Sequence, residues 1–186
     1  MNYNDAKQKF ETYLESYDRS NDKVRLKIIH TYGVVHDMSE ICHRMHLTEE
    51  DTELARIIAC FMTSDVEQLK RFDSFEPTTM DHAAYGVQVL FEEGMIRQFV
   101  PEDTWDDIIR TAIARHSDFR LEGIQDERTL FHAKMIRDAD KLGQLQSEAG
   151  GFCGGYDRCP SGACRRRQNI SKGMGILPEK RGSFIS

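Results

Sequence analysis

Apolar residues recur at helical spacing through most of the first 145 residues, and no other feature constrains the fold of this chain as strongly. Residues 5–17 carry an apolar stripe made of Phe10, Tyr13, Leu14 and Tyr17. Residues 22–45 carry a second stripe made of Val24, Ile28, Tyr32, Val35 and Met38. Thr48 stands three residues before Asp51, as at a helix start, and Gly94 suits a helix end. No β-hairpin signal separates these segments, so the sequence predicts an all-α fold.

Composition narrows the class of protein. The chain has 186 residues, enough to bury one substantial core, and a formal net charge of -6. This negative charge argues against a nucleic-acid polymer as the partner. We find no apolar run of membrane-spanning length and no signal-peptide pattern at the N-terminus, so we expect a cytoplasmic protein with no membrane contact. The five cysteines are an odd number and do not suggest a disulfide framework.

The character of the chain changes after Leu142. The remaining sequence is rich in glycine, lacks apolar periodicity and contains Cys153, Cys159 and Cys164. The spacing of these cysteines does not match a zinc knuckle. We therefore expect a helical domain over residues 1–145 and an irregular, disordered tail over residues 146–186.

Histidines and carboxylates in the helical part suggest a metal site. Of the seven histidines, His30, His82 and His116 stand in the most suggestive contexts. The segment "IRDADKL" adds Asp138 and Asp140 late on a helix. Residues two apart on a helix point in nearly opposite directions, so only one of these aspartates can face a given ion. Imidazole nitrogens and carboxylate oxygens on facing helices are suitable ligands for a divalent cation.

Five separated segments carry a resemblance to a known family: "KIIHTYGVV", "EQLKRFDSF", "DHAAYGVQVLFEEGMIR", "IIRTAIARHSDF" and "HAKMIRDADKL". In this order they resemble the HD-domain metal-dependent phosphohydrolase superfamily over roughly residues 20–142. The resemblance implies a helical bundle with metal ligands in the order His, His-Asp, Asp. It makes His30 the first histidine and Asp140 the last aspartate.

The resemblance also implies roles for the other candidates. His82 and His116 would hold a second ion or the substrate phosphate, and Lys141 would contact that phosphate. Asp140 and Lys141 would be the catalytic residues, and His30, His82, His116 and Asp140 the metal ligands. The implied cofactor is a divalent ion (Mn, Mg, Ni, Fe or Zn). The implied substrate is a nucleotide or another small phosphate ester, attacked by metal-activated water. The oligomeric state stays open.

The central His-Asp pair of that family is absent. It belongs in residues 57–72, which read "IIACFMTSDVEQLKRF" where relatives would read about "ALLHDIGRFEQL". A literal His36-Asp37 pair exists, but it lies on the same predicted helix as His30, so we interpret it as part of a solvated face. Because His30 and Asp140 alone are too few ligands for a catalytic ion, we predict an impaired hydrolase. The alternative is an inactive module that binds a nucleotide or a protein partner.

A reading-frame shift accounts for both unusual segments. Among the degenerate codons that can encode "ACFMTSDV", the choice GCC-TGC-TTC-ATG-ACA-TCG-GAC-GT spells "LLHDIGR" when it is read two places later. In the same way, "GQLQSEAGG" can conceal "DNCRVKLE", a natural continuation of the last helix. We therefore hypothesise a frameshifted HD-domain gene. Sequencing the gene tests this, because codons that do not spell these alternatives would contradict it.

Overall fold

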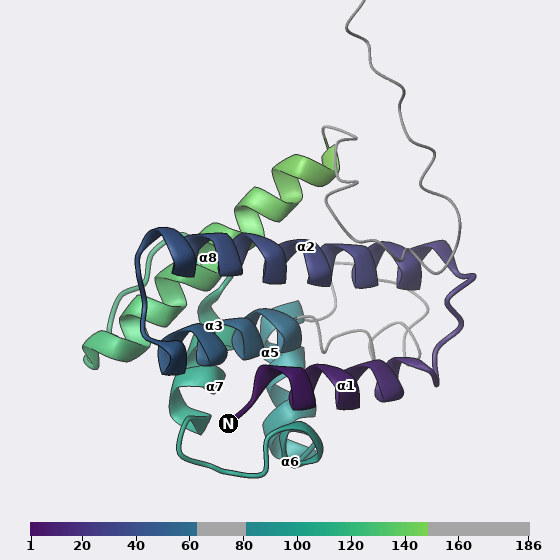
Figure 1. The fold of residues 1–186 in the computed structure, drawn as a ribbon, viewed down its shortest axis with the longest axis horizontal. Coiled ribbons are helices and arrows are strands. Elements are labelled where there is room, and N and C mark those ends of the chain that lie inside the picture. The colour runs from purple at the N-terminus through teal and green to yellow at the C-terminus, as the bar shows by residue number, and fades with distance from the viewer. Residues whose placement is uncertain (63–80, 149–186) are drawn as a thin grey trace, which may run out of the picture. The chain divides into compact units, whose positions relative to one another are not determined.

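The computed structural model describes residues 1–62 and 81–148, with side chains through residue 144. Most of the segment that should hold the central His-Asp pair lies outside this description, and so does the glycine-rich tail that we expect to be disordered. The helices are α1 (Tyr3–Leu14), α2 (Asp22–Arg44), α3 (Glu49–Phe61), α5 (His82–Val87), α6 (Ile96–Phe99), α7 (Asp106–Arg115) and α8 (Glu127–Glu148) (Figure 1). A π-helical turn, η1 (Gln88–Glu92), continues α5. The described residues contain no strand, which confirms the all-α prediction.

Side-chain caps fix where several helices begin. Asn21 Oδ1 accepts a hydrogen bond from the backbone N–H of Lys23 at 2.9 Å at the start of α2. Thr48 Oγ1 accepts from the backbone N–H of Asp51 at 3.1 Å at the start of α3. These bonds satisfy N–H groups that have no partner inside the helix. The Thr48 cap confirms the helix start predicted from its spacing to Asp51.

Gly94 ends the α5–η1 segment, as the sequence predicts. Its φ is +75°, in the left-handed region that glycine adopts without a Cβ penalty. The chain can therefore reverse directly after η1 and enter α6.

An aromatic cluster forms the part of the core to which α1, α3 and α6 contribute. The rings of Phe61 and Phe99 stack with centroids 4.8 Å apart, and Phe10 meets Phe61 edge-on at 5.8 Å. All three side chains are buried. The long helices α2 and α8 pack on each other, and α7 packs on α8. This packing brings residues from the two ends of the helical part side by side.

The chain divides into two compact units, Met1–Phe152 and Cys153–Ser186, and the second lies wholly outside the described residues. Helix α8 continues to Glu148, three residues beyond the boundary expected at residue 145. None of the described helices is long and apolar enough to cross a membrane.

Candidate functional site

His30 and Asp140 meet across the contact between α2 and α8. His30 Nε2 lies 2.9 Å from Asp140 Oδ1, although the two residues are 110 positions apart in the sequence. A carboxylate can only accept, so the Nε2–H of His30 is the donor. Asp140 is buried, whereas Asp138, the other aspartate of "RDAD", is exposed. The structure thus brings together the first and last ligands that the resemblance implies.

The second oxygen of Asp140 is also engaged. Gln144 Nε2 donates to Asp140 Oδ2 at 2.8 Å, one helical turn further along α8. With His30 on one oxygen and Gln144 on the other, the carboxylate is held in one orientation. Sequence reasoning missed Gln144, and its position four residues after Asp140 on the same helix was the available signal.

His82 and His116 form a second pair, between α5 and the end of α7. Their Nε2 atoms are 3.1 Å apart, and the rings meet edge-on with centroids 4.9 Å apart. His116 Nδ1 lies 2.6 Å from the backbone oxygen of Ile113, which can only accept, so the proton is on Nδ1. In the neutral pair, His116 Nε2 therefore accepts from the Nε2–H of His82. His116 is buried, whereas the side chain of His82 is 46 % exposed.

Lys141 and the His36-Asp37 pair, the other candidates from the sequence, differ in how exposed they are. Lys141 follows Asp140 on α8 and is exposed. The interpretation of the literal His36-Asp37 pair as part of a solvated helix face is confirmed for His36, which is exposed, and wrong for Asp37, which is buried.

Part of the altered segment, through Met62, is described, and it supplies no metal ligand in place of the missing pair. Cys60 and Phe61 are buried in the core. Burial raises the pKa of the Cys60 thiol far above its ordinary value. A thiol that stays protonated is a poor metal ligand, because the thiolate is the binding form.

The side chains of the two pairs are of the types that bind a divalent ion, but too few of them lie together to hold one. Imidazole and carboxylate are suitable donors, and the hydrogen bond from His116 Nδ1 to a backbone carbonyl is of the kind that orients metal-bound histidines. However, residues 1–62 and 81–144 contain no group of three or more His, Cys, Asp or Glu side chains able to hold an ion. The four predicted ligands form two pairs, each closed by a contact between its own members.

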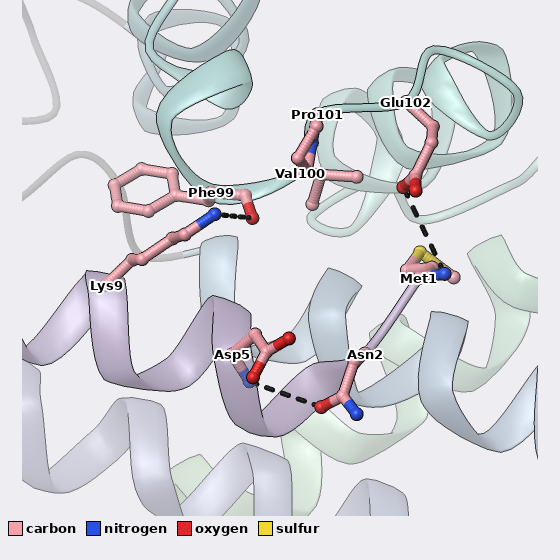
Figure 2. Close-up of a pocket in the computed structure, with 8 residues that line it drawn as sticks. All are labelled: Met1, Asn2, Asp5, Lys9, Phe99, Val100, Pro101 and Glu102. Carbon is pink, nitrogen blue, oxygen red and sulfur yellow. Dashed lines mark hydrogen bonds and ion pairs between the residues drawn. The ribbon is translucent and has the colours of Figure 1, made fainter.

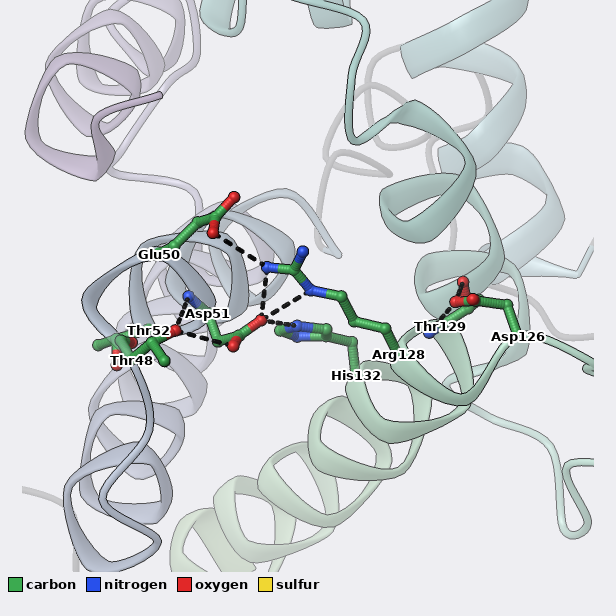
Figure 3. A network of polar contacts seen from close by, with 8 residues as sticks. All are labelled: Thr48, Glu50, Asp51, Thr52, Asp126, Arg128, Thr129 and His132. Atoms are coloured by element: carbon green, nitrogen blue, oxygen red, sulfur yellow. Dashed lines mark hydrogen bonds and ion pairs between the residues drawn. The ribbon is translucent and has the colours of Figure 1, made fainter.

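A third polar cluster, which sequence reasoning missed, joins the starts of α3 and α8 (Figure 3). Asp51 accepts from Arg128 Nε at 2.8 Å and from His132 Nε2 at 3.3 Å. We call Asp51, Arg128 and His132 the Asp51 cluster. The four-residue spacing of Arg128 and His132 places both on one helical face, but it does not reveal their common partner.

The hollow shown in Figure 2 lies apart from all of these residues. Its volume is about 190 Å³, and its lining includes Met1, Lys9, Phe99 and Glu102. Lys9 Nζ donates to the backbone oxygen of Phe99 at 3.4 Å, so the lysine joins α1 to the end of α6. None of the predicted site residues lines this hollow.

No protein-family model, curated protein or solved structure matches this chain. Membership of the HD-domain superfamily therefore stays a prediction.

Proposed function

We propose that this chain is a metal-dependent phosphohydrolase of the HD type, acting on a nucleotide or another small phosphate ester, and that its turnover is impaired. One observation carries the proposal. His30 and Asp140, predicted as the outer ligands from opposite ends of the helical part, lie 2.9 Å apart. Two of the groups that the proposed chemistry needs are thus already together on α2 and α8.

The impairment follows from the number of ligands. Catalytic metal sites usually use three or more protein ligands, and the described part of the chain offers pairs only. An ion at His30 and Asp140 would also have to replace the proton on His30 Nε2 and break an existing hydrogen bond. We expect weak metal binding for this reason.

His82 and His116 are suited to the phosphate in this proposal. Phosphate oxygens accept hydrogen bonds, and the side chain of His82 is 46 % exposed. Its Nε2–H would turn to a phosphate oxygen by releasing its present acceptor, His116 Nε2. The Nδ1–H of His116 is already given to Ile113, so His116 can donate to phosphate only through a protonated Nε2. Lys141, exposed beside Asp140, would add positive charge.

A second candidate function is a non-catalytic module of the same fold that binds a nucleotide or a protein partner. The direct contacts within both pairs, His30 with Asp140 and His82 with His116, favour this binding module. A direct contact between its two members joins each pair, His30 of α2 with Asp140 of α8 and His82 of α5 with His116 at the end of α7.

Repair of the altered segment distinguishes the two functions. The test compares this chain with a variant in which "CFMTSDV" (residues 60–66) is replaced by "LLHDIGRF". Both are assayed for cleavage of a generic phosphoester with Mn²⁺ or Ni²⁺, and metal binding is measured by calorimetry. The proposal expects turnover in the repaired chain at least ~100-fold above this chain, because the third and fourth ligands complete the site.

Variants of the repaired chain provide the controls. His30→Gln and Asp140→Asn should remove metal binding and turnover. Lys134→Ala, at an exposed position on α8, should change neither. If the repaired chain folds, binds a nucleotide and cleaves nothing, the proposed hydrolase is wrong and the binding module is supported.

A further inference from the structure

The Asp51 cluster contains a buried titratable group that the proposed function does not use. His132 is fully buried on α8, and its Nε2 faces Asp51 Oδ1 at 3.3 Å. Because the carboxylate accepts, Nε2 carries the proton, and Nδ1 of the neutral ring holds only a lone pair. This Nδ1 has no hydrogen-bond partner among the described residues.

Asp51 is engaged from several directions. Thr48 Oγ1–H donates to its Oδ2 at 2.8 Å. Arg128 contacts Oδ1 through both Nε, at 2.8 Å, and Nη2, at 2.7 Å. Arg128 also lies over the ring of Trp105, 4.3 Å from its centroid, and 3.7 Å from Glu50. The N-terminal turn of α3 is thus connected to the first two turns of α8 (Figure 3). Through Arg128 the connection extends to Trp105, the residue that precedes α7.

The ring of His132 tolerates this arrangement only when it is neutral. A second proton would have to sit on Nδ1, where it would be a buried donor without an acceptor among the described residues. The charged groups that act on the ring are Asp51 from α3 and Arg128 from α8 itself, and among the described residues α2 and α7, which also pack on α8, add none. Burial lowers the pKa of His132, and this effect outweighs the opposing attraction of Asp51.

We propose that the Asp51 cluster is an acid-sensitive connection, which holds the start of α8 on the start of α3 while His132 is neutral and releases it when His132 takes up a proton. The inference does not rest on the proposed function. It assigns a conformational role to residues outside the predicted site.

The pH window follows from the direction of the shift. The pKa of His132 is below its ordinary value of about 6.5 when the cluster is formed and returns to that value when the cluster opens. The contribution of His132 to stability is therefore complete above pH ~6.5 and falls as the pH drops toward the lowered pKa. Uptake of one proton raises the fraction of open molecules by up to about tenfold per pH unit within this window.

Asp51 does not titrate in the pH range in which His132 is expected to take up its proton. Burial raises the pKa of its carboxyl group, but the hydrogen bonds from Thr48, Arg128 and His132 outweigh this and leave the pKa below 3.8. Asp51 therefore stays charged between pH 5 and 7.5.

Hydrogen exchange on the full chain tests the inference. Protection factors, which remove the direct effect of pH on exchange chemistry, are measured for amides of α8 between residues 130 and 136 from pH 7.5 to 5. In the wild type they should fall, by up to about tenfold per pH unit, from pH ~6.5 down to the lowered pKa of His132. His132→Gln keeps a neutral N–H donor near the position of Nε2 and should remove this dependence. His43→Gln, which alters an exposed histidine of α2, should leave it unchanged.

A second measurement keeps the inference testable if His132→Gln does not fold. Long-range ¹H–¹⁵N NMR of the wild type reports the protonated nitrogen of His132 directly. We expect the Nε2–H tautomer at pH 7.5 and a titration below pH 6.5. Titration of His132 at or above pH 6.5 would overturn the inference. Protection factors of the α8 amides that depend equally on pH in His132→Gln and in the wild type would also overturn it.

Discussion

Gly143 lies where α8 packs closely on Val34 of α2, near His30. A Cβ at this position would lie 3.1 Å from Val34 Cγ2 and 3.5 Å from His30 Cε1. Side chains rarely approach as closely as the 3.1 Å to Val34, so even alanine would press on α2 there, whereas 3.5 Å from His30 is an ordinary contact distance. The absence of a side chain at residue 143 allows α8 to pack closely on α2 at Val34.

This contact predicts an energetic coupling between Gly143 and Val34. Gly143→Ala gains helix propensity but crowds Val34, and the smaller side chain of Val34→Ala removes the crowding atom. Urea unfolding of both single variants and the double variant should show Gly143→Ala to be more favourable by about 1 kcal/mol in the Val34→Ala background. Equal effects of Gly143→Ala in both backgrounds would contradict the close contact.

At the scale of elements, the caps decide where the helices that carry the site begin. Helix α2 carries His30, and its first turn depends on Asn21, which accepts from the backbone N–H of Lys23 at 2.9 Å and of Val24 at 3.5 Å. The exposed position of Asn21 means that packing contributes little there.

We therefore expect Asn21→Ala to destabilise the chain by about 1 kcal/mol, because the N–H groups at the start of α2 lose their acceptor. Asn21→Ser retains an acceptor and should stay within about 0.5 kcal/mol of the wild type. Urea unfolding followed by circular dichroism measures both. If the alanine and serine variants are equally stable, the cap does not stabilise α2.

At the scale of the whole helical part, the aromatic cluster joins segments from three regions of the sequence. Phe10 of α1, Phe61 of α3 and Phe99 of α6 are each almost fully buried, whereas Phe119 in the connection between α7 and α8 is 86 % exposed. The loss of unfolding free energy when a phenylalanine side chain is removed should therefore be larger at the buried positions than at Phe119.

Phe10→Ala should cost about 3–5 kcal/mol, because it loses apolar burial and leaves a cavity beside two other rings. Phe119→Ala is the matched control and should change stability by less than about 0.5 kcal/mol. Thermal and urea unfolding provide the comparison. Similar losses in both variants would show that the cluster is not part of the core.

The sequence by itself determined the helices, because helix formation depends on apolar spacing and on caps a few residues away. Thr48 with Asp51, and Gly94, were identified in this way, and the structure confirms them. The sequence also selected His30 and Asp140 as residues that belong together, but only through a resemblance to a family. The function assigned to them stays a prediction.

Only the tertiary structure decided which side chains meet, because such contacts depend on how distant helices pack. It arranged the four predicted ligands as two separate pairs, which neither the spacing of the residues nor the resemblance predicted. It also gave His132 its buried contact with Asp51, 81 positions away in the sequence. Local periodicity shows the face of its own helix on which a residue lies, but it carries no information about the partner helix that covers that face.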